Sequence, residues 1–102
     1  MPAATRIADA DVAHCSGMVR AQGSPNVFVN GRAWSRQGDN NTVHLRPVPG
    51  DPPCINHAAP IAVGSTKVFV NNMGAGRVGD AISGCTSVAA GSENVFAGPP
   101  IS

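Results

Sequence analysis

The chain has 102 residues and a net charge of +1, and its 12 Gly and 9 Pro are accompanied by no Tyr. These values predict one domain with a thin core, built from turns and short strands. The scattered basic residues argue against nucleic-acid binding. No apolar run approaches the roughly 20 residues of a membrane-spanning helix, and the N-terminus lacks the basic and apolar segments of a signal peptide.

Two short motifs recur along the chain. Arg and Asp stand three residues apart at Arg6/Asp9, Arg36/Asp39 and Arg77/Asp80, and a Gly-Ser-x-x-Val-Phe motif follows in segments 23–31, 64–72 and 91–98. A recurring pair of motifs is typical of a repeat architecture. We therefore expect a single domain over 1–102 with three repeats at about 3–31, 33–72 and 74–98.

Each Gly-Ser motif is expected to open a strand. In the second repeat the strand runs from Gly64 and closes at Asn71-Asn72, and in the first it closes at Asn30-Gly31, a strong hairpin signal. Successive strand residues face opposite ways, so the Val residues on either side of each Phe share one face. We expect these Val faces to point toward a common axis; the alternative is the opposite arrangement, with the three Phe residues stacked on the axis. The chain ends should then lie close together in an all-β, cone-shaped, pseudo-threefold domain.

The recurring Arg and Asp have two interpretations. They could form a ring of charge that binds a partner or ligand. Alternatively, each pair could lock a tight turn through local hydrogen bonds, or form a surface ion pair worth about 0–1 kcal/mol. We favour the second interpretation.

All His and Cys residues fall in the three connections between the motifs, which are expected to be loops. Five residues after the Asp of each turn stand His14, His44 and Cys85, so a threefold arrangement would bring them to one point. His57 is the natural fourth ligand from the longest connection, and the set of three His and one Cys suits a structural Zn²⁺. Cys54 competes with His57, and Cys15 is a weaker candidate because neighbouring residues in an extended segment point to opposite sides.

The other interpretation of these residues is a scatter of structural or exposed His and Cys. Three Cys is an odd number, which argues against a complete disulfide framework. Four side chains would close the shell of a metal, whereas a catalytic zinc keeps an open position. The chain has no His-Glu-x-x-His, no phosphate-binding Gly-rich loop and a single Glu, Glu93. We therefore expect no catalytic residues, no enzyme activity and no small-molecule substrate. A zinc-dependent hydrolase is the alternative if Cys54 or His57 is not a ligand.

With these motifs in hand, the chain resembles the PAAR-repeat family, named after a Pro-Ala-Ala-Arg block before Gly-Asp. The matching segments are 3–6, 33–36 and 74–77, followed by Ala8-Asp9, Gly38-Asp39 and Gly79-Asp80, and no copy is a perfect Pro-Ala-Ala-Arg. The resemblance covers nearly the whole chain. It implies a small β cone with a zinc near its apex, held by His14, His44, His57 and Cys85.

The same resemblance implies a function. Members of this family cap the blunt end of a trimeric β-helical spike and form the membrane-puncturing tip of a contractile injection machine. That machine is either a phage tail, which we slightly favour, or a type VI secretion apparatus. The expected partners are the spike, at one chain per trimer, and transiently the target membrane. We expect no appended effector domain, and a place in the virion or outside the cell after cytoplasmic synthesis. The alternative function is a small zinc-binding interaction module.

Overall fold

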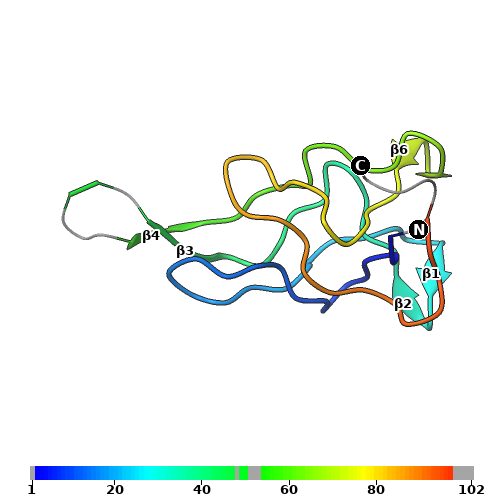
Figure 1. The fold of residues 1–102 in the computed structure, drawn as a ribbon, viewed down its shortest axis with the longest axis horizontal. Coiled ribbons are helices and arrows are strands. Elements are labelled where there is room, and N and C mark those ends of the chain that lie inside the picture. The colour runs from blue at the N-terminus through cyan, green and yellow to red at the C-terminus, as the bar shows by residue number, and fades with distance from the viewer. Residues whose placement is uncertain (1, 48, 51–53, 98–102) are drawn as a thin grey trace.

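Short strands and turns form the whole of the fold in the computed structural model, which describes residues 2–47, 49–50 and 54–97 (Figure 1). No helix occurs in those residues, so none could cross a membrane there. The strands are β1 (Phe28–Val29), β2 (Arg32–Ala33), β3 (His44–Pro47), β4 (Cys54–His57), β5 (Phe69–Val70) and β6 (Met73–Gly74). They pair as the antiparallel hairpins β1–β2, β3–β4 and β5–β6. The prediction of an all-β domain is therefore confirmed.

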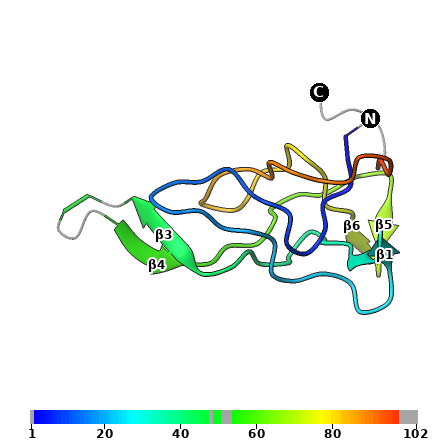
Figure 2. The ribbon, with the colours of Figure 1, turned by 90° about the horizontal axis from the view of Figure 1, so that it is seen from below.

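The molecule is elongated, with principal extents of 42 × 27 × 24 Å. The β3–β4 hairpin lies at one end of the long axis, and β1–β2 and β5–β6 lie near the opposite end (Figures 1 and 2). Two small apolar clusters make the core. Val70, Ala75 and Ala97 pack together with Trp34 among their neighbours. The second cluster consists of Ala59, Ile61, Ile82 and Val88.

Tight two-residue turns close β1–β2 and β5–β6. Asn30 and Gly31 have φ of 54° and 79°, and Asn71 and Asn72 have 53° and 67°. Two successive positive φ values define the type I′ turn, which matches the twist of a hairpin and favours Asn and Gly. The hairpin predicted at Asn30-Gly31 is confirmed.

The strand predicted from Gly64 is shorter than expected, because only Phe69–Val70 is paired as β5. The Ser65 hydroxyl accepts hydrogen bonds from the amides of Lys67 and Val68, at 3.1 and 2.9 Å. These local bonds curl the backbone into a turn, since a serine side chain near its own backbone competes with sheet pairing.

The two ends of the described chain pair with one another. Ala3 forms an antiparallel bridge with Phe96, the Ala4 amide donates to the Val95 carbonyl, and the Ala97 amide donates to the Pro2 carbonyl. The expectation that the ends lie close together is confirmed. Gly98, the last residue of the third predicted repeat, lies outside the described residues.

A closed ring of backbone hydrogen bonds joins three distant segments. Thr5 donates to the Gly76 carbonyl at 3.1 Å, Gly76 to Ser35 at 2.9 Å, and Ser35 to Thr5 at 3.0 Å. Gly76 is required for this approach, because a Cβ there would lie 2.4 Å from the Ser35 carbonyl oxygen.

The Val and Phe residues of the repeated motif face opposite environments, as the alternation predicts. The buried residues are Val29, Val70 and Ala97, at 3, 3 and 0% exposure. The exposed residues are Phe28, Phe69 and Phe96, at 59, 60 and 49%. The aliphatic side of each motif therefore builds the core, and the aromatic side is left on the surface.

Each recurring Arg and Asp closes one tight turn. In the first turn the Asp9 carboxylate accepts hydrogen bonds from the Arg6 amide and guanidinium, at 2.8–3.0 Å, and the Asp9 amide donates to the Arg6 carbonyl. The same bonds recur between Arg36 and Asp39, and between Arg77 and Asp80. The prediction of a locally locked turn is confirmed.

These ion pairs are not at the open surface, which corrects the sequence-based expectation. The residues Asp9, Asp39 and Asp80 are only 6, 6 and 3% exposed. Burial acts to raise the pKa of Asp9, but the hydrogen bonds from Arg6 and Arg32 outweigh it and hold this pKa below its usual value. The first Arg-Asp turn is therefore stabilised by an ionised carboxylate.

Candidate metal centre

Four side chains from distant parts of the sequence converge at one point: His14, His44, His57 and Cys85. One ligand atom from each lies within 4.8 Å of all the others. The Cys85 Sγ is 2.8 Å from His14 Nε2, 3.4 Å from His44 Nε2 and 3.6 Å from His57 Nε2. The group could hold a metal ion, and it contains all four residues that the sequence indicated.

The β3–β4 hairpin contributes two of these residues. His44 begins β3, His57 ends β4, and the register pairs them directly. Residues paired across two strands share a face of the sheet, and the two imidazole ring centres are 4.3 Å apart. The sequence predicts a loop in this connection, and the structure shows the β3–β4 hairpin instead. The Pro49-Gly50 dipeptide between the strands was the available turn signal.

A tight turn presents Cys85. Its amide donates to the Ile82 carbonyl at 3.0 Å, and Gly84 takes a positive φ of 60° within the turn. Cys85 packs against the core cluster that contains Ile82 and Val88. The sulfur ligand is therefore anchored to the core rather than carried by an unsupported loop.

His14 belongs to a segment that leaves and rejoins the body of the protein. Ala10 bridges to Val19, and the Asp11 amide donates to the Met18 carbonyl at 3.2 Å. The His14 ring lies 5.1 Å from the His44 ring in a stacked arrangement. Its place in the group thus depends on contacts with the β3–β4 hairpin.

The surroundings of the imidazoles favour metal binding. His44 Nδ1 lies 2.8 Å from the Thr42 carbonyl, which can only accept a hydrogen bond, so Nδ1 carries the proton and Nε2 faces the centre with its lone pair. Burial lowers the pKa of His14 and His57, and the neighbouring basic side chains of His44 and Arg46 lower both further. A lowered pKa favours the neutral imidazole, which is the form in which His14 and His57 can coordinate a cation.

A buried polar network supports the sulfur. The Asn41 amide nitrogen lies 3.9 Å from Cys85 Sγ and 3.2 Å from Asp11 Oδ2, and the Asn41 oxygen accepts the Ala59 amide at 2.9 Å. Asp11 also lies 3.7 Å from the guanidinium of Arg20, which is fully buried. Burial raises the pKa of Asp11 and lowers that of Arg20. Hydrogen bonds around a metal site orient the side chains that bind the ion, and the Asn41 amide group can donate to the Cys85 thiolate.

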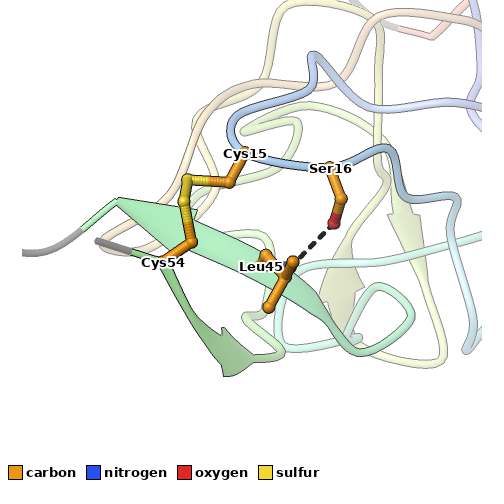
Figure 3. The surroundings of a disulfide bond; sticks show 4 residues. All are labelled: Cys15, Ser16, Leu45 and Cys54. Carbon is orange, nitrogen blue, oxygen red and sulfur yellow. Dashed lines mark hydrogen bonds between the residues drawn. A yellow bond between two sulfur atoms is a disulfide. The ribbon is translucent and has the colours of Figure 1, made fainter. Parts of the chain in front are cut away.

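The two other cysteines are not ligands. Cys15 and Cys54 form a disulfide bond, with Cα atoms 6.2 Å apart (Figure 3). The suggestions that Cys54 competes with His57, or that Cys15 supplies a ligand, are therefore wrong, because both sulfurs are bonded to one another. The sequence held no signal for this pairing, since a disulfide partner cannot be deduced from spacing alone.

The fold and the site together define a small strand-only domain that could hold one metal ion through three imidazoles and one thiolate. No protein-family model matches the chain, and comparison with curated protein sequences gives no significant match.

Proposed function

We propose that this chain is a PAAR-repeat spike tip, a structural protein that caps the trimeric β-helical spike of a contractile phage tail or a type VI secretion apparatus. The observation that carries this proposal is the ring of hydrogen bonds among Thr5, Ser35 and Gly76. These residues occupy the same position in the three repeats. Each donates to one neighbouring repeat and accepts from the other, as a pseudo-threefold axis would require.

A second set of bonds supports the same symmetry. It consists of the amides of Ile7, Gln37 and Val78 donating to the carbonyls of Ala33, Gly74 and Ala3, at 2.9, 2.8 and 2.9 Å. Each bond again joins one repeat to the next. Ala3 pairs with Phe96 as Ala33 pairs with Phe28 in β1–β2 and Gly74 with Phe69 in β5–β6. Two hairpins and one pairing of the chain ends therefore surround the proposed axis.

The end that carries these hairpins suits a partner with true threefold symmetry. Phe28, Phe69 and Phe96 are exposed there, one from each repeat. Three equivalent aromatic side chains and three short strand edges could meet three equivalent edges of a trimer, extending its strands by β-augmentation. The elongated shape, with the β3–β4 hairpin at the opposite end, supports a cone that narrows toward the metal centre.

Zinc is the ion that the four residues favour. Zn–S and Zn–N bonds of about 2.3 and 2.0–2.1 Å in a tetrahedron place S and N about 3.6 Å apart. Two of the three S···N distances, 3.4 and 3.6 Å, match this edge, and the third would lengthen around an ion. Four protein ligands leave no open position for substrate, so the proposed role is structural and the protein is not an enzyme.

This role requires stiffness more than chemistry. A small domain gains little stability from its core, and a zinc ion converts binding free energy into folding free energy. The proposed site of action is the tip of a virion tail, or the exterior of a cell after delivery by a contractile machine. There the tip would contact the target membrane only transiently.

The test is binding of the zinc-loaded chain to the purified blunt end of a trimeric β-helical spike, followed by native mass spectrometry. We expect one chain per trimer. Replacing Phe28, Phe69 and Phe96 by Ser should abolish binding without loss of zinc. The matched control is Val43→Ser, which alters an apolar residue of 70% exposure outside these hairpins and should bind normally.

Two outcomes would overturn the proposal. In the first, the wild-type chain binds zinc but does not bind any spike, which would indicate a zinc-binding interaction module. The other is a metal-bound water with measurable hydrolysis, which would indicate a zinc-dependent hydrolase.

A further inference from the structure

The disulfide joins two of the segments that carry metal-binding residues. Cys15 directly follows His14, and Cys54 is the first residue of β4, the strand that ends at His57. The cross-link spans 39 residues of sequence. The disulfide is therefore one residue away from His14 in the sequence and three residues away from His57.

Among the described residues, ring contacts of His14 with His44 and His57 and a few hydrogen bonds also connect the His14 segment to the β3–β4 hairpin. The Leu45 amide donates to the Ser16 hydroxyl at 2.9 Å, beside the disulfide (Figure 3). Further along, the amide of Val19 donates to the Thr42 hydroxyl and the amide of Thr42 donates to the Val19 carbonyl, at 3.2 and 2.9 Å. The disulfide is the one covalent restraint on the position of the His14 segment against β4.

We propose that Cys15–Cys54 is a redox lock on the metal centre. The disulfide form binds the metal more tightly, and releases it more slowly, than the dithiol form. In the locking step a small-molecule disulfide such as oxidised glutathione accepts two electrons from the two thiols. One S–S bond forms in the protein, one breaks in the oxidant, and the two protons go to the two glutathione thiols that result.

The physical basis is preorganisation. Without the cross-link, a metal must gather His14 to the hairpin at the cost of the conformational freedom of the intervening chain. With the cross-link, that freedom is already lost before the ion binds. Cys85 is the free cysteine of the described chain, so oxidation of the other two leaves the donor set of three imidazoles and one thiolate intact.

Linkage makes the coupling reciprocal. If the disulfide tightens metal binding, then the bound metal must lower the reduction potential of the disulfide. A tenfold change in the metal Kd corresponds to about 30 mV for this two-electron couple. The inference rests on the proposed function only in requiring that the four residues bind a metal ion.

The first experiment measures the Zn²⁺ Kd of the full chain by competition with a chromophoric chelator. Three forms are compared: the oxidised protein, the dithiol form after reduction and removal of the reductant, and the Cys15→Ser/Cys54→Ser variant. We expect the Kd to rise at least tenfold in the dithiol form and in the variant, with faster zinc release. Ser16→Ala removes only the neighbouring hydrogen bond and should change the Kd less than threefold.

The second experiment needs no variant. Wild-type protein is equilibrated in glutathione redox buffers with and without Zn²⁺, and the fraction of disulfide is read by thiol labelling. We expect zinc to lower the potential by at least 30 mV.

Equal Kd values in the oxidised and dithiol forms, or tighter binding by the dithiol form, would overturn the redox lock and leave the metal centre standing. An unchanged potential would overturn it independently. Failure of the oxidised chain to bind any zinc would overturn the metal centre itself, and the lock with it.

Discussion

The third residue of each Arg-Asp turn has a positive φ, so the cost of a Cβ in this conformation can be compared between equivalent turns of one molecule. Ala8, Gly38 and Gly79 occupy this position and have φ of 74°, 90° and 93°. Their amides are fixed by hydrogen bonds to the carbonyls of other segments, at 2.9–3.0 Å, so the backbone cannot easily relax. Only the first turn carries a Cβ in this left-handed conformation.

The expected magnitude follows from two opposing effects. An L-residue with a Cβ in the left-handed region costs about 1–2 kcal/mol, and Gly costs about 0.5–1 kcal/mol in lost chain entropy. Ala8 is exposed, so its methyl group loses no packing when removed. Ala8→Gly should therefore stabilise the protein by about 0.5–1 kcal/mol. Gly38→Ala should destabilise the protein by a similar amount. No atom lies within 4 Å of the added Cβ, so the effect comes from the backbone conformation and not from a steric clash.

The assay is urea unfolding of the metal-loaded protein, with thermal melts as a second measure. A change of 1 kcal/mol corresponds to about 4–8 °C in a domain of this size. Gly17→Ala is the matched control, because it adds a Cβ into open space where φ is not positive, and it should not destabilise. A neutral Gly38→Ala, or an Ala8→Gly that loses stability, would refute the argument that these turns share one strained position.

Three further predictions concern charge, packing and metal. Because the folded-state pKa of Asp9 is lowered, its carboxylate contributes stability at neutral pH that is lost as the pH falls through and below about 4. In urea unfolding, Asp9→Asn should lower the unfolding free energy at pH 7 and lower it much less at pH 3. The control Glu93→Gln, at an exposed position, should change the unfolding free energy little at either pH. Equal effects of Asp9→Asn at both pH values would contradict this prediction. Val70→Ala should cost about 1.5–2.5 kcal/mol in unfolding free energy, from two buried methyl groups and the space they leave. Val63→Ala, at an exposed position, should change it by less than about 0.5 kcal/mol, and equal effects of the two would show that the Val70 cluster is not a core. Zinc at 1,000 times its Kd should add about 4 kcal/mol, so EDTA should lower the melting temperature and deprotect the amides of β3 and β4 in hydrogen exchange. His57→Ala should remove this response to EDTA, and an unchanged wild-type melt would count against the metal centre.

Features that depend on neighbouring residues were predictable from the sequence. Asn30-Gly31 forms its turn because both residues tolerate positive φ. Arg6 and Asp9 close a turn because an Asp carboxylate reaches backbone and guanidinium three residues away. The candidate metal site could also be predicted from the sequence, because His14, His44 and Cys85 occupy the same position in the three repeats. The structure brings these residues together.

Features that depend on distant pairings were not predictable. The β3–β4 hairpin was treated as a loop, because two strands of four residues leave little periodic signal. The disulfide between Cys15 and Cys54 joins residues whose spacing says nothing about their approach. The extent of burial at the Arg-Asp turns was underestimated, because it depends on the segments that pack over them.

The amino-acid sequence by itself determined the kinds of turn, the placing of Val and Phe on opposite faces of each strand, and the residues available to hold a metal, since each follows from local stereochemistry or from the repeat. The structure decided that the Val faces are the buried ones. Only the tertiary structure decided that His44 and His57 are paired across the β3–β4 hairpin, and that Cys15 and Cys54 are bonded to each other instead of serving as metal ligands. The physical reason is that such contacts depend on the paths of the intervening segments and on their pairing across the domain, which local preferences do not specify.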